Sequence, residues 1–324
     1  MLKSVISFDG TKIYYKIIKK GQPYLMLIHG VGSSSKIWEE EIKILSKAGF
    51  SLIAPDLRGH GISDKPQHRD AYFLHHFAHD IEHILRKEKI NKIVPIGYSF
   101  GGVVSILYYN IYPHRINSMV LISTSYKMPI KLYFIYKIKY VIHKITRRKD
   151  DEKRKSIEAL NHCISQMMEY SINFKKQNIK QLSNIKVPVL FIEGTKDRVI
   201  PVRHMENTCR FIKTASLNKI EGADHNIITT RREELNKQML DFFNRNLRNI
   251  QFDLNKIAIA SLLGIVIGFL STPEALKIFV SGGITGAAIS GLMIEKQLLG
   301  IELVFKTIIS IVLLLLFYNL FRKK

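Results

Sequence analysis

The segment Gly97-Tyr98-Ser99-Phe100-Gly101 constrains the fold of this chain more than any other feature. It follows the apolar run 90–96, which predicts a buried strand, and it precedes residues 100–112, which predict a helix. Small residues two positions before and two after the serine allow a tight strand-to-helix turn that leaves the hydroxyl exposed. The helix N-terminus would place partial positive charge beside that hydroxyl. The pattern therefore predicts a nucleophilic serine at the end of a strand.

Strand and helix patterns alternate through most of residues 1–247. Apolar runs predict strands at 3–8, 12–18, 24–29, 51–55, 118–123, 187–193 and 215–220. Apolar residues at helical spacing predict helices at 36–48, 71–88 and 233–247. This alternation predicts an α/β fold with a mainly parallel sheet covered on both faces. It stops between 124 and 184, so we expect an inserted helical cap over about 125–184.

The net charge and the cysteine content limit which partners and which cellular compartment are expected. The net charge of +22 fits either an anionic membrane surface or a composition rich in Ile, Lys and Asn. No base-reading motif is present, so we expect no nucleic-acid partner. Cys163 and Cys209 are too few for a disulfide scaffold, and residues 1–10 lack the long apolar stretch of a secretory signal. A reduced, cytoplasm-facing compartment is expected for residues 1–250.

A serine nucleophile needs a base, a group that orients the base, and donors for the developing oxyanion. Asp197 directly follows the predicted strand 187–193, and His225 directly follows the strand 215–220. In an open α/β sheet, ligands bind at the carboxyl ends of the strands, where both residues would lie. The chain order Ser, Asp, His is the one expected for the strand–elbow–helix architecture.

Five segments carry a resemblance to a known family. They are His29-Gly30-Val31-Gly32-Ser33, residues 56–64, the serine elbow, Gly194 to Asp197, and Gly222 to His225. In this order they resemble the α/β-hydrolase superfamily, in particular its small capped serine hydrolases, such as carboxylesterases, enol-lactone hydrolases, acylglycerol lipases and cofactor-free haloperoxidase-like enzymes. The resemblance covers about residues 1–247 and implies an α/β-hydrolase fold.

The resemblance implies a role for each matching residue. Ser99 would be the nucleophile, His225 the general base and acid, and Asp197 the orienting carboxylate. The backbone N–H groups of Val31 and Phe100 would form the oxyanion hole. Serine at position 99 argues against the epoxide-hydrolase and dehalogenase branches, where an aspartate is expected. No cofactor is implied, and no residue cluster has the spacing of a zinc site.

Several of these residues have simpler interpretations. Asp197 could cap a helix beginning near Pro201, and Glu193 is a rival acid within or at the end of its strand. His29 is expected to support its loop, and residues 56–64 are expected to be structural, with Arg58 and Asp64 available for ion pairs. The two cysteines are expected to be bystanders.

The cap contains a basic amphipathic segment at 131–145. Its isoleucines share one side, namely Ile135, Ile138, Ile142 and Ile145, while Lys137, Lys144, Arg147 and Arg148 lie elsewhere on the helix. Such a helix can lie in a membrane interface. The favoured interpretation is a cap helix that turns its apolar face to the active site and its lysines to water. The two interpretations are compatible.

From Lys256 onward the chain becomes strongly apolar, with runs at 257–271, 277–294 and 301–321. The third would be about 31 Å long as a helix, enough to span a bilayer. Gly282, Gly286 and Gly291 would allow close helix–helix association. We therefore expect a hydrolase domain at 1–250 and a membrane-embedded region at 256–324. Basic residues before and after the tail both favour the cytoplasmic side, which leaves the number of crossings open.

Together these features predict a membrane-anchored serine hydrolase that cleaves an ester, thioester or lactone with an apolar acyl part. Its partners would be a small-molecule or lipid-derived ester and membrane lipids. The alternative is a membrane scaffold or binding protein that keeps the fold without turnover.

Overall fold

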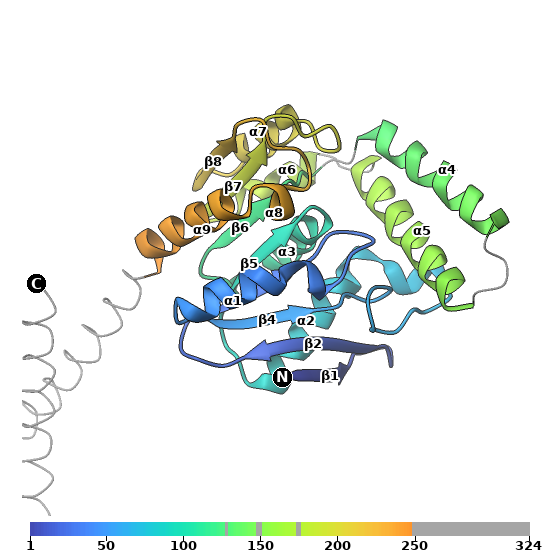
Figure 1. The fold of residues 1–324 in the computed structure, drawn as a ribbon, viewed down its shortest axis with the longest axis horizontal. Coiled ribbons are helices and arrows are strands. Elements are labelled where there is room, and N and C mark those ends of the chain that lie inside the picture. Colours follow the sequence, from blue (N-terminus) through green and yellow to red (C-terminus); the bar gives the residue numbers. More distant parts are fainter. Residues whose placement is uncertain (127–128, 147–150, 173–175, 248–324) are drawn as a thin grey trace, which may run out of the picture. The chain divides into compact units, whose positions relative to one another are not determined.

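The computed structural model describes residues 1–126, 129–146, 151–172 and 176–247 (Figure 1). Eight strands form one sheet in the order β1-β2-β4-β3-β5-β6-β7-β8. Their bounds are β1 Leu2–Ile6, β2 Lys12–Ile18, β3 Tyr24–Ile28, β4 Ser51–Pro55, β5 Ile93–Tyr98, β6 Met119–Ile122, β7 Val189–Gly194 and β8 Ala215–Ile220. The first two strands are antiparallel additions, and the strands from β4 to β8 in the sheet order run parallel. The predicted fold, an α/β structure with a mainly parallel sheet, is confirmed.

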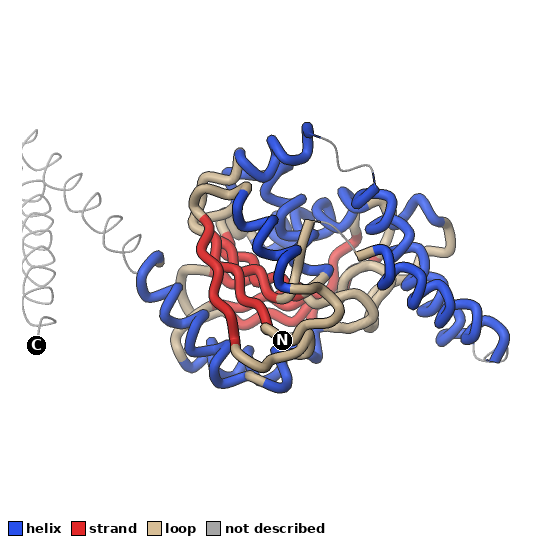
Figure 2. Tube along the Cα trace, turned by 90° about the horizontal axis from the view of Figure 1, so that it is seen from above, coloured by secondary structure: helices blue, strands red, loops and turns tan. Residues whose placement is uncertain are grey.

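The strands in the middle of the sheet are apolar because helices cover both faces. Every residue of β4, β5, β6 and β7 is buried, as expected for parallel strands with helices on either side. Figure 2 shows helices above and below the strands. These helices are α1 (Glu39–Lys47), α2 (Leu74–Glu88), α3 (Phe100–Ile111), α7 (Val202–Arg210), α8 (Ile227–Thr230) and α9 (Arg232–Asn246).

Helix pairs are held by specific contacts. On one face, α1 meets α9 where Arg232 Nε donates to Glu41 Oε1 at 3.1 Å. Helix α2 meets α3 where the rings of Phe77 and Phe100 pack edge to face, 5.1 Å between centroids. The second contact holds the first residue of α3 in place, directly after the serine elbow.

Two predicted helices begin differently from the expectation. The segment predicted at 36–48 starts as a 3-10 turn (η1, Ser35–Trp38) before α1, and the one predicted at 71–88 starts as η2 (Arg69–Tyr72) before α2. Phe73, between η2 and α2, has ψ of 135°, which interrupts the helical path. A third short turn, η3 (Pro113–Arg115), follows α3.

The loop 56–64 is structural, and its centre is Arg58. This side chain is fully buried and forms two bonds to Asp80 of α2, with Nε–Oδ2 at 2.7 Å and Nη2–Oδ1 at 2.6 Å. It also donates to Asp9 Oδ2 at 2.8 Å. Asp64 accepts the backbone N–H of Lys12 at 2.9 Å, which ties the loop to β2.

The cap lies between β6 and β7, and its helices are α4 (Ile130–Thr146), α5 (Asp151–Ile172) and α6 (Lys176–Ser183). The favoured interpretation of 131–145 is wrong in its orientation. Ile135, Ile138 and Ile142 of α4 are 49%, 60% and 52% exposed, and none lines the pocket around Ser99. The side chain of Ile145 lies outside the described residues.

The reason for this orientation lies on α5. Lys137 of α4 donates to Asn161 Oδ1 at 2.6 Å and to Ser165 Oγ at 2.8 Å, and its ammonium lies over the ring of Tyr133. The side of α4 that faces the protein is therefore aromatic and polar. Because α5 supplies the hydrogen-bond partners of that side, the isoleucine side of α4 faces away from the protein.

Among the residues described above, no helix is both long and apolar enough to span a bilayer. The three apolar runs at 257–271, 277–294 and 301–321, with Gly282, Gly286 and Gly291, lie outside the described residues.

Candidate active site

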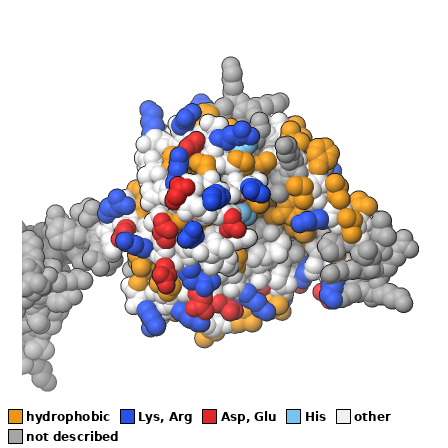
Figure 3. All heavy atoms as spheres, turned by 45° about the horizontal axis from the view of Figure 1, so that its top comes forward, with side chains coloured by type: hydrophobic (Ala, Val, Ile, Leu, Met, Phe, Trp, Pro, Cys, Tyr) orange, Lys and Arg blue, Asp and Glu red, His pale blue; other side chains and the backbone are white. Residues whose placement is uncertain are grey.

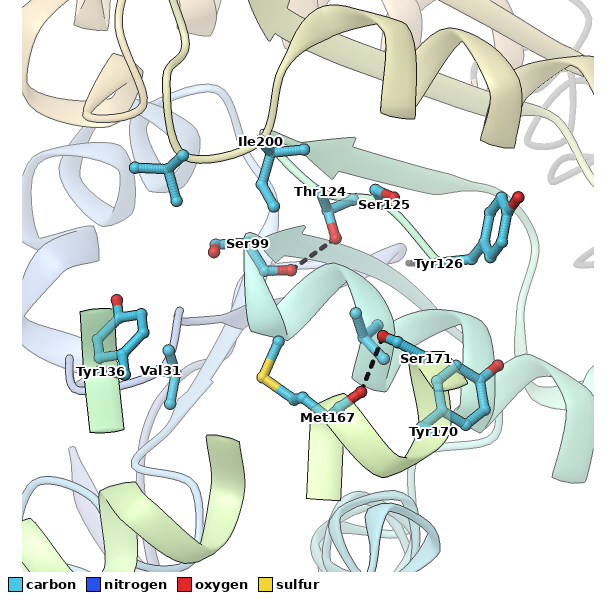
Figure 4. A pocket seen from close by; sticks show the side chains of 12 residues that line it. Val31, Ser99, Thr124, Ser125, Tyr126, Tyr136, Met167, Tyr170, Ser171 and Ile200 are labelled. Carbon is cyan, nitrogen blue, oxygen red and sulfur yellow. Dashed lines mark hydrogen bonds between the residues drawn. The ribbon is translucent and has the colours of Figure 1, made fainter. Parts of the chain in front are cut away.

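Ser99 occupies a strained turn between β5 and α3. Its φ is 52° and its ψ is −114°, a conformation that a non-glycine residue adopts only when the surroundings impose it. The backbone is held on both sides, because Ser99 N–H donates to Ile122 O at 2.8 Å and Ser99 O accepts from Thr124 Oγ1 at 2.6 Å (Figure 4). A Cβ at Gly101 would lie 2.1 Å from Ile28 O. The elbow therefore requires its flanking glycine.

The structure brings Ser99, Asp197 and His225 together from the ends of three strands. His225 Nε2 lies 3.2 Å from Ser99 Oγ, and His225 Nδ1 lies 2.7 Å from Asp197 Oδ2. Because a carboxylate can only accept, Nδ1 carries the proton and Nε2 is free to accept the serine O–H. In this geometry His225 can take the proton of Ser99, and Asp197 can hold the imidazole in place.

Asp197 is locked in place by its own loop. Its side chain is fully buried, and Oδ1 accepts the backbone N–H groups of Val199 at 2.7 Å and Ile200 at 2.8 Å. Pro201 is the N-cap of α7, and no side chain caps that helix end. Asp197 therefore braces the loop before the helix, and Oδ2 remains available to His225.

A second carboxyl group, Glu193, lies beside Asp197 at the end of β7. Its side chain is fully buried; Oε1 accepts the N–H of Gly194 at 3.0 Å, and no donor among the described residues reaches Oε2. Burial and the neighbouring charge of Asp197 raise the pKa of Glu193 far above its ordinary value. A protonated Glu193 supplies the missing hydrogen and can donate it to Asp197. Glu193 is thus a neighbour of the orienting acid, and His225 bonds to Asp197.

The two backbone amides predicted for the oxyanion hole belong to the first residue of α3 and to the loop beside the elbow. Phe100 is the first residue of α3, where N–H groups have no intrahelical acceptor. Val31 lines the same pocket as Ser99, and a Cβ at Gly30 would lie 3.3 Å from Ser99 Cβ, so this loop passes against the elbow. Within the described part of the chain, neither amide donates to another group. His29 supports this loop as predicted, since its buried ring accepts the N–H of Leu57 at 3.0 Å.

The pocket beside Ser99 is narrow and mainly apolar. Its lining comes from the sheet edge, from α3, from the loop before α7 and from the cap: Val31, Ser99, Val103, Thr124, Ser125, Tyr126, Tyr136, Met167, Tyr170, Ser171, Val199 and Ile200. Figure 4 shows Tyr136 and Met167 facing the elbow from the cap helices. The free volume is about 20 Å³, room for little more than one water molecule. An acyl chain therefore requires the lining of the pocket to shift.

Sequence reasoning missed most of these lining residues. Tyr136 of α4, and Met167 and Tyr170 of α5, lie in a segment without a motif that relates them to Ser99. Tyr98, within the elbow motif itself, donates its hydroxyl to His225 O at 3.0 Å and holds the loop that carries the imidazole. The only available signal was its position next to the serine.

The remaining candidates lie away from this chemistry. Cys163 is buried in the core, and burial raises the pKa of its thiol. Among the described residues, no group of His, Cys, Asp and Glu side chains is arranged to hold a metal ion.

Comparison with known proteins agrees with the sheet order and the elbow. The family model described as "alpha/beta hydrolase fold" matches residues 23–139, a range that contains β3 to β6 and Ser99. This match, together with the fold, supports membership of the α/β-hydrolase superfamily. Within that superfamily the chain is 26% identical over 263 residues to the AB hydrolase superfamily protein YisY of Bacillus subtilis, covering 73% of this chain and 97% of that protein.

Two further similarities extend the comparison. Protein ABHD8 of Homo sapiens is 25% identical over 254 residues, which cover 67% of this chain and 54% of that protein. The chain thus matches about half the length of this relative. An esterase from Exiguobacterium antarcticum superposes with a TM-score of 0.62 at 21% identity, over 75% of this chain and all of the esterase. At that identity the likeness concerns the α/β-hydrolase fold.

Proposed function

We propose that this chain is a membrane-anchored serine hydrolase that cleaves a carboxylic ester, thioester or lactone through an acyl-enzyme on Ser99. The observation that carries the proposal is the line of contacts from Asp197 Oδ2 to His225 Nδ1 and from His225 Nε2 to Ser99 Oγ, at 2.7 and 3.2 Å. The structural similarity to the esterase from Exiguobacterium antarcticum supports the same reaction class.

The first half-reaction uses Ser99 as nucleophile and His225 as base. Ser99 Oγ attacks the carbonyl carbon while its proton passes to His225 Nε2. The carbonyl oxygen becomes an oxyanion, which accepts from the N–H groups of Val31 and Phe100. When the intermediate collapses, His225 returns the proton to the leaving oxygen or sulfur, and the acyl group remains on Ser99.

The second half-reaction restores the enzyme. A water molecule gives its proton to His225 Nε2 and attacks the acyl carbon, and the acid product leaves as Ser99 Oγ regains a proton. Asp197 stabilises the imidazolium that forms in both halves. The two bonds from Val199 and Ile200 to Asp197 Oδ1 keep the carboxylate in this position.

An apolar acyl part and a membrane anchor complete the proposal. Val103, Met167 and Ile200 give the pocket an apolar lining, which favours an acyl chain over a polar one. The apolar runs after Lys256 would anchor the chain in a membrane. The hydrolase domain would lie on the cytoplasmic side.

A serine-directed fluorophosphonate probe tests the nucleophile. The full-length protein should be labelled, and Ser99→Ala should lose both the label and ester turnover, the latter by about 10⁴-fold or more. Ser171→Ala is the matched control, because that hydroxyl lines the same pocket and donates to Met167 O at 2.9 Å. Absence of labelling in the folded, unsubstituted protein would favour the scaffold alternative. Labelling that persists in Ser99→Ala would place the nucleophile elsewhere.

A further inference from the structure

The outward side of α4 is the largest set of exposed apolar side chains on any one described helix. Six large apolar residues there are 49% to 60% exposed: Ile130, Phe134, Ile135, Ile138, Val141 and Ile142. Ile130, Phe134, Ile138 and Ile142 follow one another at four-residue spacing, so they form a stripe along one side of the helix. In Figure 3, hydrophobic side chains gather toward the right of the molecule, where Figure 1 places the cap helices. A patch of this kind marks an interaction surface.

The charge of the cap indicates which partner this surface fits. Helix α4 contains four lysines and no acidic residue. Residues 125–184 contain fourteen Lys and Arg against five Asp and Glu. Lys139 is exposed beside the stripe, whereas Lys137 faces α5. An exposed apolar stripe beside Lys139, on a cap of net positive charge, is the pattern of a helix lying in the interface of an anionic bilayer.

The same helix closes the active-site pocket. Tyr136, on the inward side of α4, lines the pocket together with Ser99 and Met167. Because that pocket has a free volume of only about 20 Å³, an acyl chain needs more room, which a shift of the cap would supply. Among the described elements, α4 packs chiefly against α5. It can therefore move without disturbing the strands that position Ser99, Asp197 and His225.

We propose that the Ile130–Ile142 face of α4 docks on an anionic lipid bilayer and admits a membrane-resident ester to Ser99 from the lipid phase. The docking is inferred from the exposed apolar stripe and from the positive charge of the cap. The delivery of substrate rests on the proposed hydrolase function. Docking through α4 is a contact additional to the anchoring predicted for residues 256–324. Docking through α4 would turn the pocket toward the membrane leaflet that α4 contacts.

Tryptophan reporters in the full-length protein test the docking. Phe134→Trp places a reporter in the stripe, and Ile6→Trp places one at a similarly exposed position on β1, where Ile6 is 56% exposed. The native Trp38 is fully buried and supplies a background measured in the unsubstituted chain. The vesicles contain equal parts phosphatidylcholine and phosphatidylglycerol with brominated acyl chains, which quench on contact.

The expected result is that brominated lipid lowers the added Phe134→Trp emission by about twofold or more, as for a helix buried in the interface. The Ile6→Trp emission should not change, and quenching at position 134 should weaken in pure phosphatidylcholine. An unquenched Phe134→Trp overturns the proposal. Emission that shifts to the blue without quenching also overturns it, because another part of this chain or a second copy then covers the face.

A pair of ester substrates tests delivery separately. Phe134→Ser with Ile138→Ser should slow hydrolysis of a long-chain ester embedded in the vesicles by about tenfold and leave hydrolysis of a water-soluble short-chain ester unchanged. Leu2→Ser with Ile6→Ser, in β1, is the matched control and should affect neither. Equal losses on both esters would overturn lipid delivery, since the pocket itself would be damaged. If the unsubstituted protein cleaves neither ester, the hydrolase function fails, and the fluorescence result still decides the docking.

Discussion

Replacing Asp197 with asparagine should reverse the hydrogen bonding of His225. Asp197 Oδ1 accepts two backbone N–H groups, from Val199 and Ile200, so an asparagine oxygen would take this position. The asparagine NH₂ would then face His225 Nδ1, 2.7 Å away in the native arrangement. Since NH₂ can only donate, Nδ1 would have to accept, and the imidazole proton would move to Nε2. A protonated Nε2 cannot take the proton of Ser99.

The magnitude follows from the loss of the correct tautomer while the geometry is kept. An asparagine in the orienting position of such a site costs about 10⁴ in kcat, equal to about 5 kcal/mol of transition-state stabilisation. The assay is steady-state hydrolysis of a water-soluble ester by the full-length protein, with thermal unfolding as a check on the fold. We expect kcat to fall and the unfolding temperature to change little, because asparagine has the same shape.

Glu193→Gln is the matched control for this experiment. Because burial and the charge of Asp197 raise the pKa of Glu193, the native side chain is neutral at neutral pH, and glutamine is also neutral and a donor. Turnover of Glu193→Gln should stay within a few-fold of the native value. An Asp197→Asn protein that retains about a tenth or more of native turnover would refute the reasoning. A Glu193→Gln protein that loses as much as Asp197→Asn would move the orienting role to Glu193.

Three further predictions concern stability and the membrane. Arg58→Met should lower the free energy of unfolding by about 3 to 5 kcal/mol, measured by denaturant titration, because it leaves the buried Asp80 without its cation. Burial lowers the pKa of His60 to about 3, so acid favours the unfolded chain below about pH 6.5, where a free histidine protonates. Relative to His60→Asn, the native protein should lose about 2 kcal/mol of unfolding free energy by about pH 5. Alkaline carbonate should leave the full-length chain in the membrane pellet, since the apolar runs after Lys256 are expected to span the bilayer.

Each of these has a contrary outcome. Arg58→Met with Asp80→Asn should recover part of the loss, because no buried charge is then left alone; no recovery would mean that packing of the guanidinium dominates. If the free energy of unfolding depends on pH in the same way for the native protein and for His60→Asn, then His60 takes up its proton as readily in the folded state as in the unfolded state. Release of the chain by carbonate would contradict the predicted spans.

Local features of the sequence were sufficient for the order of the elements and for the elbow. Glycine at position 97 is required because a Cβ there would lie 2.4 Å from Gly101 O, an atom of the same turn, so a five-residue pattern carries that information. Strand positions follow from short apolar runs, because parallel strands are buried on both faces. Asp197 and His225 could be selected as candidate site residues because each follows such a run, at the carboxyl end of a predicted strand.

Three features depended on tertiary structure. The contact of 2.7 Å between Asp197 Oδ2 and His225 Nδ1 depends on the pairing of β7 with β8, which brings together two loops that are separate in the sequence. The charge state of Glu193 depends on its burial beside Asp197. The orientation of α4 was predicted wrongly because amphipathicity shows that a helix has two sides without showing which one meets the protein. Asn161 and Ser165 of α5 offer Lys137 hydrogen bonds, so the isoleucine side is left outward.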